Sequence, residues 1–437
     1  MNILYRYISI AFVLAGFSGS AQNILTAEQA LQITLENNFG LKIARNNVSI
    51  SENNASLMNS GYLPTVNLRA GANYANNNSS LEFSDGRTQD VTGAESVSTN
   101  AALEASYVVF NGMARSEQWK KYKLTHSLSE LDAQLTTENT IMQLLQAYYQ
   151  LAFLKEQNSI QQQMISISND RMKRSVLMQE YGQGNELQVL NASVDLNNDS
   201  ISLFNLTQQY NNAQRNLNLI MGREANGVFD ADTSIAFNGL TNIDLLLEKT
   251  ISQNVQLLQA RQNIQLAEQD SRISKASYLP SVSVNGTYNY NSSQNQAGFI
   301  LGQNVNGLST GASLNWNLFD GGGTSTRVKN AKIRTENTKE LLAQIQLQTE
   351  IQLRNAWSDY QNKLFIFQKE KSNMKVNQQN FKYSKQRMEI GQITGTDFRL
   401  AQINLARTIS NLSKAKYDAK IAELEVLHIA GMLIQGL

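Results

Sequence analysis

Hydrophobic positions along this chain change between a helical spacing and a spacing of two. The longest helical stretch runs from Gly112 to Tyr181 and contains no proline. Its apolar residues recur at three- and four-residue intervals, or at the sum of these: Leu124, Leu128, Leu131, Leu135, Met142, Leu145, Tyr149 and Ala152. This period predicts one α-helix, which would measure roughly 105 Å at 1.5 Å per residue. A helix of that length needs a coiled-coil-like partner.

Each long helix leads through a glycine-containing turn into a returning helix. The second long helix and the two returning helices are predicted over Thr324–Glu389, 186–221 and 396–433. The turn glycines are Gly182, Gly184, Gly391 and Gly395. Glycine reaches positive φ without steric cost, so these residues are expected to form the turns in that conformation. The pattern therefore predicts two long antiparallel helical hairpins.

Four shorter segments alternate apolar and polar residues, and these precede the two helical hairpins. Their apolar positions are Val66, Leu68, Ala70, Ala72 and Tyr74; Ala101, Leu103, Ala105, Tyr107 and Val109; Val282, Val284, Gly286, Tyr288 and Tyr290; and Ala312, Leu314, Trp316 and Leu318. Alternation predicts strands of about ten residues with one apolar face, in β-hairpins over 65–110 and 281–319. A tilted strand of this length fits the apolar band of an outer-membrane barrel, near 25 Å. A soluble hairpin packed on a core remains an equal alternative from the strands alone.

The two β-hairpins contain polar, glycine-containing stretches at about 75–98 and 291–307. These stretches are predicted to be loops at the strand ends far from the helices. Because outer-membrane barrels place their longer loops outside the cell, we expect both loops to be extracellular.

The prolines mark an internal repeat. Tyr62–Leu63–Pro64 matches Tyr278–Leu279–Pro280, and a helical pattern runs into each proline. Farther on, Phe110–Asn111–Gly112 matches Phe319–Asp320–Gly321 at each change from strand to helix. The repeat predicts a first structural unit over 22–221, a linker over 222–243 and a second unit over 244–437. Each of the two units has an opening helix, a β-hairpin and a long helical hairpin, and the second unit ends in a C-terminal tail.

The first residues are typical of an export signal, predicted over 1–21. Arg6 lies in a short polar start, Ile8–Phe17 is apolar, and Gly19–Ser20–Ala21 offers small residues for cleavage. The apolar run is shorter than the roughly 20 residues that span a bilayer as a helix. The chain is therefore expected to be exported.

Composition excludes several classes of function. Lys and Arg number 37 against 36 Asp and Glu, so the formal net charge of +1 gives no case for a nucleic-acid partner. The absence of cysteine excludes disulfides, thiolate metal sites and a cysteine nucleophile. Two histidines and no recognisable nucleophile–base pair predict that the chain is not an enzyme and carries no cofactor or metal.

Four strands cannot close a membrane barrel, because the smallest barrel has eight. The duplication, the proline-to-strand transition, the Phe-Asx-Gly turn and the glycine turn of each helical hairpin occur twice in the same order. In these features the chain resembles the TolC-like outer-membrane efflux proteins (outer-membrane factors). The resemblance implies a mainly α fold with membrane β: a homotrimer with a twelve-stranded β-barrel continuous with a periplasmic α-helical tunnel, and a mixed belt around the middle of the tunnel.

The resemblance also implies a function and partners. The trimer would sit in outer-membrane lipid and let substrates leave a periplasm-spanning efflux or secretion complex. That complex would include a periplasmic adaptor, or membrane fusion protein, and an inner-membrane pump. The alternative from another class is a periplasmic coiled-coil adaptor or scaffold without a pore, although such proteins normally have a single helical hairpin flanked by small β-domains.

By resemblance, Asp397 matches an acid that lines the periplasmic aperture of the tunnel. The family often carries a second acid one turn later, where this chain has Leu400. In the first repeat the matching positions are Gln188 and Asn191, which are uncharged. A purely local role for Asp397 at the start of a helix, with Thr394 or Thr396 as N-cap, is compatible with the aperture role.

Two further groups of positions follow from the same resemblance. The turn glycines named above would lie at hairpin tips that dock the adaptor. The strand–helix junctions are Tyr62, Pro64, Phe110, Gly112, Tyr278, Pro280, Phe319 and Gly321. The aromatic members of this group would form an interfacial belt, and plain packing at the junction is the equal alternative.

Overall fold

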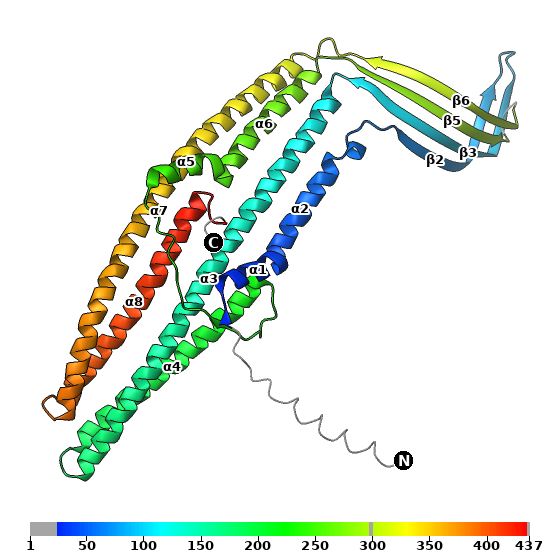
Figure 1. Cartoon of the computed structure of the whole chain (residues 1–437). Coiled ribbons are helices and arrows are strands. Elements are labelled where there is room, and N and C mark those ends of the chain that lie inside the picture. The colour runs from blue at the N-terminus through cyan, green and yellow to red at the C-terminus, as the bar shows by residue number, and fades with distance from the viewer. Residues whose placement is uncertain (1–23, 297–299, 435–437) are drawn as a thin grey trace, which may run out of the picture. The chain divides into compact units, whose positions relative to one another are not determined.

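The computed structural model describes residues 24–296 and 300–434, and long helices dominate it (Figure 1). The predicted export signal, residues 1–21, lies outside the described residues. The long helices are α3 (Ala114–Glu180), α4 (Glu186–Met221), α7 (Gly323–Glu389) and α8 (Gly395–Ile429). They confirm the two predicted helical hairpins. None of the described helices combines the length and apolar character needed to cross a bilayer.

Contacts divide the chain into two compact units, and each unit draws on both halves of the sequence. Among the described residues, the helical unit holds 24–46, 131–258 and 344–434. The sheet unit holds 47–130, 259–296 and 300–343. This grouping follows contact rather than sequence similarity, so the predicted repeat boundaries stay a prediction.

The opening helix of each repeat is broken in two, which the periodicity did not predict. The pieces are α1 (Ala27–Asn37) and α2 (Phe39–Ala55), and α5 (Ile243–Gln253) and α6 (Val255–Ala276). Asn38 and Asn254 lie at the breaks, and each side chain accepts a hydrogen bond from a backbone N–H of the following helix, at 3.0 and 3.1 Å. The other side of each amide donates to the last turns of α4 and α8, to Ile220 O at 2.7 Å and Ile429 O at 2.9 Å. The asparagine at each break therefore binds the last turn of a returning helix.

Two glycines make this docking possible. Gly222 and Gly431 follow α4 and α8 with φ of 67° and 70°. A Cβ on Gly222 would lie 2.4 Å from Asn37 O, and a Cβ on Gly431 would lie 2.7 Å from the backbone of Gln253. Because of this turn α8 ends at Ile429, before the predicted residue 433. The helix before the first proline is also shorter than predicted, since α2 ends at Ala55 and a short 3₁₀ turn (Leu57–Asn59) follows.

The sheet unit contains four antiparallel neighbours in the order β2-β3-β5-β6. They are β2 (Thr65–Glu82), β3 (Thr88–Asn111), β5 (Ser281–Asn295) and β6 (Gly302–Asn315). The prediction of ten-residue strands was wrong, because pairing continues through much of the supposed loops at 75–98 and 291–307. Backbone hydrogen bonding between strands does not need apolar alternation, and the Asn-, Ser- and Thr-rich stretches remain paired. Trp316 and Leu318 lie beyond the end of β6.

The helical unit has its largest hydrophobic core where α3, α4 and α8 meet. Ile141, Leu144, Leu145, Tyr148 and Leu151 of α3 are buried there, with Leu217 and Met221 of α4 and Leu424 of α8. Beside this core β1 (Ile24–Leu25) pairs in parallel with β4 (Asp230–Ala231). The strand β4 lies within the predicted linker, residues 222–243, whose place in a belt around the tunnel stays a prediction.

A fully buried carboxylate fixes the end of that segment. Glu423 of α8 is 0% exposed and accepts hydrogen bonds from the backbone N–H groups of Asn238 and Gly239, at 2.7 and 3.2 Å. Lys420 Nζ donates to its other oxygen at 2.7 Å. A buried charge is tolerated only when paired and hydrogen-bonded in this way. The connection between the repeats is therefore held against α8 by Glu423.

Candidate functional site

All four strands of the sheet place their apolar side chains on the same face. The register pairs Leu68 with Leu103, Leu103 with Tyr288, and Tyr288 with Leu308, so one apolar row crosses the whole sheet. Leu68 and Leu308 are 73% and 72% exposed. Water-soluble surfaces rarely carry a continuous apolar area of this kind. The face is suited to contact with lipid hydrocarbon.

The opposite face of the sheet is polar and mostly uncharged. Its members include Asn67, Arg69, Asn73, Asn100, Glu104, Asn285, Thr287 and Asn289. Arg69 and Glu104 form an ion pair across the first two strands at 3.7 Å. Alternation of an apolar outer face with a polar inner face is typical of the strands that line a water-filled barrel.

The two outer strands of this sheet, β2 and β6, each have a neighbour on one side only. An edge strand presents unpaired N–H and C=O groups, and such groups cannot remain unpaired in the hydrocarbon of a membrane. The described sheet thus requires further strands at both edges if its apolar face lies in lipid.

At the first strand–helix junction, packing involves two of the predicted residues, Tyr62 and Gly112. The Arg115 guanidinium lies over the Tyr62 ring at 4.2 Å and donates to Val108 O at 2.6 Å and Gly61 O at 3.1 Å. Gly112 has φ of 66°, and a Cβ on it would lie 2.3 Å from a backbone oxygen of α6. Only glycine fits at this crossing.

The second junction is more open. Gly321 also has positive φ, but nothing lies within 4 Å of the place a Cβ would take. Phe319 is 85% exposed, and Tyr278 is exposed as well. Asp320 caps α7 through hydrogen bonds from Thr324 N and Oγ1, at 2.7 and 2.6 Å. The belt role of the aromatic residues stays a prediction, and exposure of Phe319 and Tyr278 is compatible with it.

Each of the two hairpin tips contains a glycine with positive φ. Gly182 and Gly391 have φ of 70° and 73°, as the sequence predicted. The prediction of positive φ was wrong for Gly184 and Gly395. At Gly184 close approach is the constraint, because a Cβ would lie 3.1 Å from a backbone nitrogen of α3. Gly395 is simply the first residue of α8.

Asp397 lies in a capping box at the start of α8. Its backbone N–H donates to Thr394 Oγ1 at 3.1 Å, and its carboxylate accepts from Thr394 Oγ1 at 2.7 Å and Thr394 N at 3.2 Å. These hydrogen bonds hold the pKa of the Asp397 carboxyl below its usual value. At the start of α4, Asn185 and Gln188 form the same box without a charge. The local role of Asp397 is established by this geometry, and its aperture role stays a prediction.

Near the tips a polar network joins three helices, and sequence reasoning missed it. Arg399 of α8 donates to both carboxylate oxygens of Asp199 on α4, at 2.7 and 2.8 Å. Ser168 of α3 donates to the same carboxylate at 2.5 Å, and Gln402 donates to Ser168 Oγ at 2.9 Å. Arg171 and Asp195 form an adjacent ion pair between α3 and α4. The i,i+4 spacing of the two aspartates was the available signal, but their partners lie far away in the sequence.

The charge on Asp199 is stabilised by these partners. Burial alone would raise the pKa of this carboxyl, but the hydrogen bonds from Arg399 and Ser168 outweigh that effect and hold the pKa below its usual value. The side chains of Arg399 and Asp199 are 14% and 12% exposed. The network is thus a largely buried connection between the two helical hairpins.

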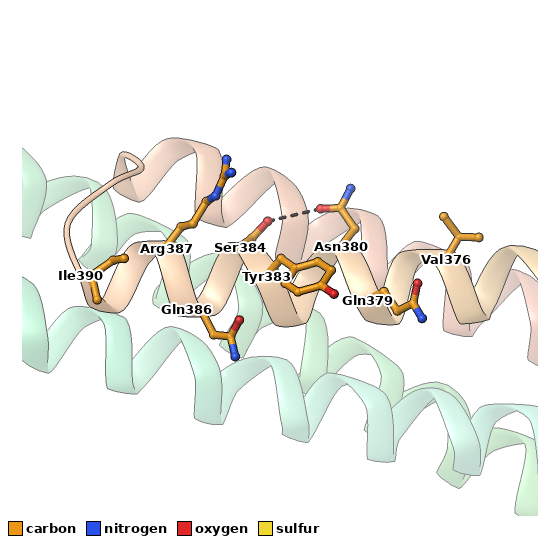
Figure 2. Close-up of a pocket in the computed structure, with 8 residues that line it drawn as sticks. All are labelled: Val376, Gln379, Asn380, Tyr383, Ser384, Gln386, Arg387 and Ile390. Carbon is orange, nitrogen blue, oxygen red and sulfur yellow. Dashed lines mark hydrogen bonds between the residues drawn. The ribbon is translucent and has the colours of Figure 1, made fainter.

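Near its C-terminal end α7 carries an apolar stripe in a shallow groove of about 750 Å³, whose lining residues Figure 2 shows. Val376, Tyr383 and Ile390 occur once every seven residues and are exposed. Amide and hydroxyl side chains flank them, and Ser384 donates to Asn380 at 3.2 Å. A seven-residue apolar repeat is typical of a helix that packs against another helix.

A matching stripe lies on α4. Its members follow steps of three, four or seven residues and are exposed: Leu187, Leu190, Val194, Ile201 and Phe204. Both stripes belong to the helical unit, one on the second helix of the first hairpin and the other on the first helix of the second hairpin. Within the described part of the chain, no apolar side chains cover either stripe, although the spacing of each predicts a packing partner.

Comparison with known proteins decides the family. The family model described as outer membrane efflux protein matches residues 30–223 and 246–432, one match for each repeat. The chain belongs to the outer membrane efflux protein family.

Individual relatives agree with this assignment. The chain is 27% identical over 188 residues to the outer membrane efflux protein BepC of Brucella suis, across 43% of this chain and 40% of that one. It is 31% identical over 124 residues to the outer membrane protein TolC of Vibrio cholerae, across 28% of each chain. The matched stretches thus span less than half of these curated relatives. The Campylobacter jejuni CmeC outer membrane channel shares the fold, with a TM-score of 0.76 at 15% identity over 93% of this chain and 86% of that one.

Membership of this outer-membrane family establishes three of the predictions. The TolC-like fold class is confirmed by the structural match. The location in the outer membrane with an extension into the periplasm follows from the family. The family is one of outer membrane efflux proteins and not an enzyme family, in agreement with the sequence prediction.

Proposed function

We propose that this chain forms an outer-membrane channel-tunnel through which substrates leave a periplasm-spanning efflux or secretion complex powered by an inner-membrane pump. The observation that carries this proposal is the amphipathic sheet. Its apolar face suits lipid and its Asn-rich face suits a water-filled lumen. Family membership adds that proteins of this kind are efflux channels.

The channel is a homotrimer in this proposal. Pairing β2 of one chain with β6 of the next is a head-to-tail contact, and such contacts generate closed rings. One chain supplies a four-stranded sheet. Two chains would reach the smallest known barrel size of eight, and three would give twelve. The resemblance to the TolC-like proteins favours a ring of three chains.

The helical stripes support the same arrangement. The stripe on α4 (Leu187, Leu190, Val194, Ile201, Phe204) of one chain would fill the α7 groove (Val376, Tyr383, Ile390) of its neighbour. This contact is again head-to-tail, so sheets and helices would close in one ring. The α4 and α7 stripes would thereby bury the apolar surface that one chain leaves exposed.

Partners would engage at the periplasmic end. A periplasmic adaptor would dock at the hairpin tips around Gly182, Gly184, Gly391 and Gly395. The trimer would bring three Asp397 carboxylates near one axis, where they attract cations and form the aperture ring. These assignments rest on the resemblance, and the exposed tips are compatible with them.

Engineered disulfides test the assembly, because the chain contains no cysteine. Tyr383→Cys on α7 is combined in turn with Leu190→Cys, Val194→Cys and Ile201→Cys on α4. When the introduced cysteines are oxidised in isolated membranes, at least one combination should give covalent dimers and trimers on denaturing gels. A control pairs Tyr383→Cys with Asn411→Cys on α8 and should give neither. Failure of every α4 combination, in protein that reaches the outer membrane, would refute the proposed contact.

The competing function is a periplasmic adaptor or scaffold without a pore. Carbonate extraction separates the two, because an integral barrel resists the wash. Release of the native chain into the soluble fraction would favour the scaffold, and retention would favour the channel.

A further inference from the structure

A cavity of about 400 Å³ lies in the helical unit between α3, the start of α6, α7 and α8. Leu135, Val255, Ala356 and Ile429 form its apolar part. Its polar lining consists of Glu138, Asn254, Gln256, Gln352, Asn355, Glu425 and His428. The cavity lies within the lower part of the usual volume range for small-molecule sites.

The lining of this cavity includes the buried carboxylate of Glu138. Glu138 is 4% exposed. Its carboxylate accepts a hydrogen bond from Gln134 Nε2, four residues earlier on α3, at 3.0 Å. None of the residues that line the cavity is Lys or Arg. Burial of a carboxylate without a cationic partner is costly. A cation bound in the cavity would therefore stabilise the ionised form of Glu138.

The second carboxylate comes from α8. Glu425 and His428 are three residues apart, a spacing that places them on one side of the helix. The amides of Gln256, Gln352 and Asn355 add carbonyl oxygens from α6 and α7. Carboxylate and amide oxygens accept hydrogen bonds from ammonium groups, and bonds to charged donors are the stronger ones.

A metal ion fits this set less well. No group of three His, Cys, Asp or Glu side chains among the described residues is close enough to hold one. The cavity also has apolar walls, which an alkyl chain would cover. An elongated molecule with ammonium groups at its ends uses both features.

We propose that this cavity binds a small aliphatic amine, a diamine or polyamine, with Glu138 and Glu425 as its counter-charges. The alkyl chain lies along Leu135, Val255 and Ile429, and the amide side chains accept the remaining N–H groups. The site is independent of the proposed assembly, since every lining residue belongs to the helical unit of one chain.

Protons compete with such a ligand. Burial raises the pKa of Glu138, while the Gln134 hydrogen bond and the charge of His428 act in the opposite direction. As pH falls, Glu138 loses its charge. This loss removes a counter-charge of the bound cation, so binding weakens below neutral pH.

Isothermal titration calorimetry of the full chain in detergent, with putrescine as the probe, tests this inference. We expect saturable binding of one putrescine per chain at pH 7.5, at least tenfold weaker binding at pH 5.5, and at least tenfold weaker binding for Glu138→Gln and Glu425→Gln. Glu130→Gln, an exposed carboxylate on α3, is the matched control and should bind as the unchanged protein does.

His428→Lys keeps the site testable if the glutamine variants fold poorly. A lysine there would supply a tethered ammonium group and should abolish putrescine binding without loss of folding. Absence of saturable binding by the unchanged chain, or equal binding by Glu138→Gln, would overturn the proposal. Binding of Mg²⁺ alone with the same dependence on Glu138 would also overturn it, in favour of a metal site.

Discussion

Replacing Arg399 by methionine should loosen the hairpin tips by removing the partner of a largely buried carboxylate. Arg399 donates to both oxygens of Asp199, at 2.7 and 2.8 Å. Methionine fills a similar space without the charge. In the variant Asp199 retains only the 2.5 Å hydrogen bond from Ser168 and the more distant charge of Arg171. The ionised carboxylate is then buried without a direct cationic partner.

The cost follows from the burial of the pair. Breaking a buried ion pair from one side typically costs about 3–5 kcal/mol. Both side chains here keep some contact with water, at 14% and 12% exposure, and Arg171 compensates in part. We therefore expect a loss of about 2–3 kcal/mol in the free energy of local opening, or roughly a hundredfold in the opening equilibrium.

The effect should depend on pH with a definite sign. In the unchanged chain the pKa of Asp199 is lowered, so its stabilising contribution is present above the unfolded pKa of about 3.9 and is lost as pH falls through the folded pKa. In Arg399→Met burial dominates and raises that pKa. Protonation of Asp199 then removes the unpaired buried charge from the variant. The difference in the free energy of local opening between the two proteins should therefore shrink as pH falls from 7 toward 4.

Hydrogen–deuterium exchange of the segment 395–405, corrected for the intrinsic effect of pH, measures this opening. The matched control is Arg354→Met on α7, whose ion pair with Glu350 has side chains 54% and 46% exposed and should contribute less than about 0.5 kcal/mol. Equal protection in Arg399→Met and the control would refute the reasoning. A pH-independent loss would indicate that packing, rather than the charge of Asp199, is responsible.

Three further predictions address the aperture, the helix docking and the orientation. Asp397→Asn should weaken cation block in single-channel recordings with little loss of assembly, and unchanged block would leave Asp397 as a helix-start residue only. Gly431→Ala should reduce protease resistance more than Gly391→Ala, because its Cβ meets backbone 2.7 Å away whereas nothing lies within 4 Å at Gly391; equal resistance would contradict the docking role. An epitope at Asp85, between β2 and β3, should be labelled on intact cells, and labelling only after permeabilisation would reverse the proposed orientation.

Sequence alone determined the elements whose signals are local. Apolar periodicity located α3, α4, α7 and α8, because an amphipathic helix carries its period wherever it packs. The glycine turns and the Thr394–Asp397 cap were also readable, since caps depend on neighbouring residues. The repeat and its ordered motifs pointed to the family, and alternation gave the apolar face of the sheet.

Tertiary structure decided what depends on residues far apart in the chain. Strand length follows from pairing with a neighbour, so the polar ends of β2 and β3 could not be located from alternation. The helix breaks at Asn38 and Asn254 exist because each amide reaches the end of another helix, at Ile220 and Ile429. The pattern around such an asparagine is helical in the sequence, and only packing shows which carbonyl it meets.

Buried charge was the other feature hidden from the sequence. Asp199, Glu423 and Glu138 lie in helices among many solvated carboxylates, and their local sequence does not show that they are buried. Their environments differ because α3, α4 and α8 pack together and remove water from particular positions. In a desolvated position, the hydrogen-bond and charge partners of a carboxylate determine its pKa. Desolvation arises only when the chain folds.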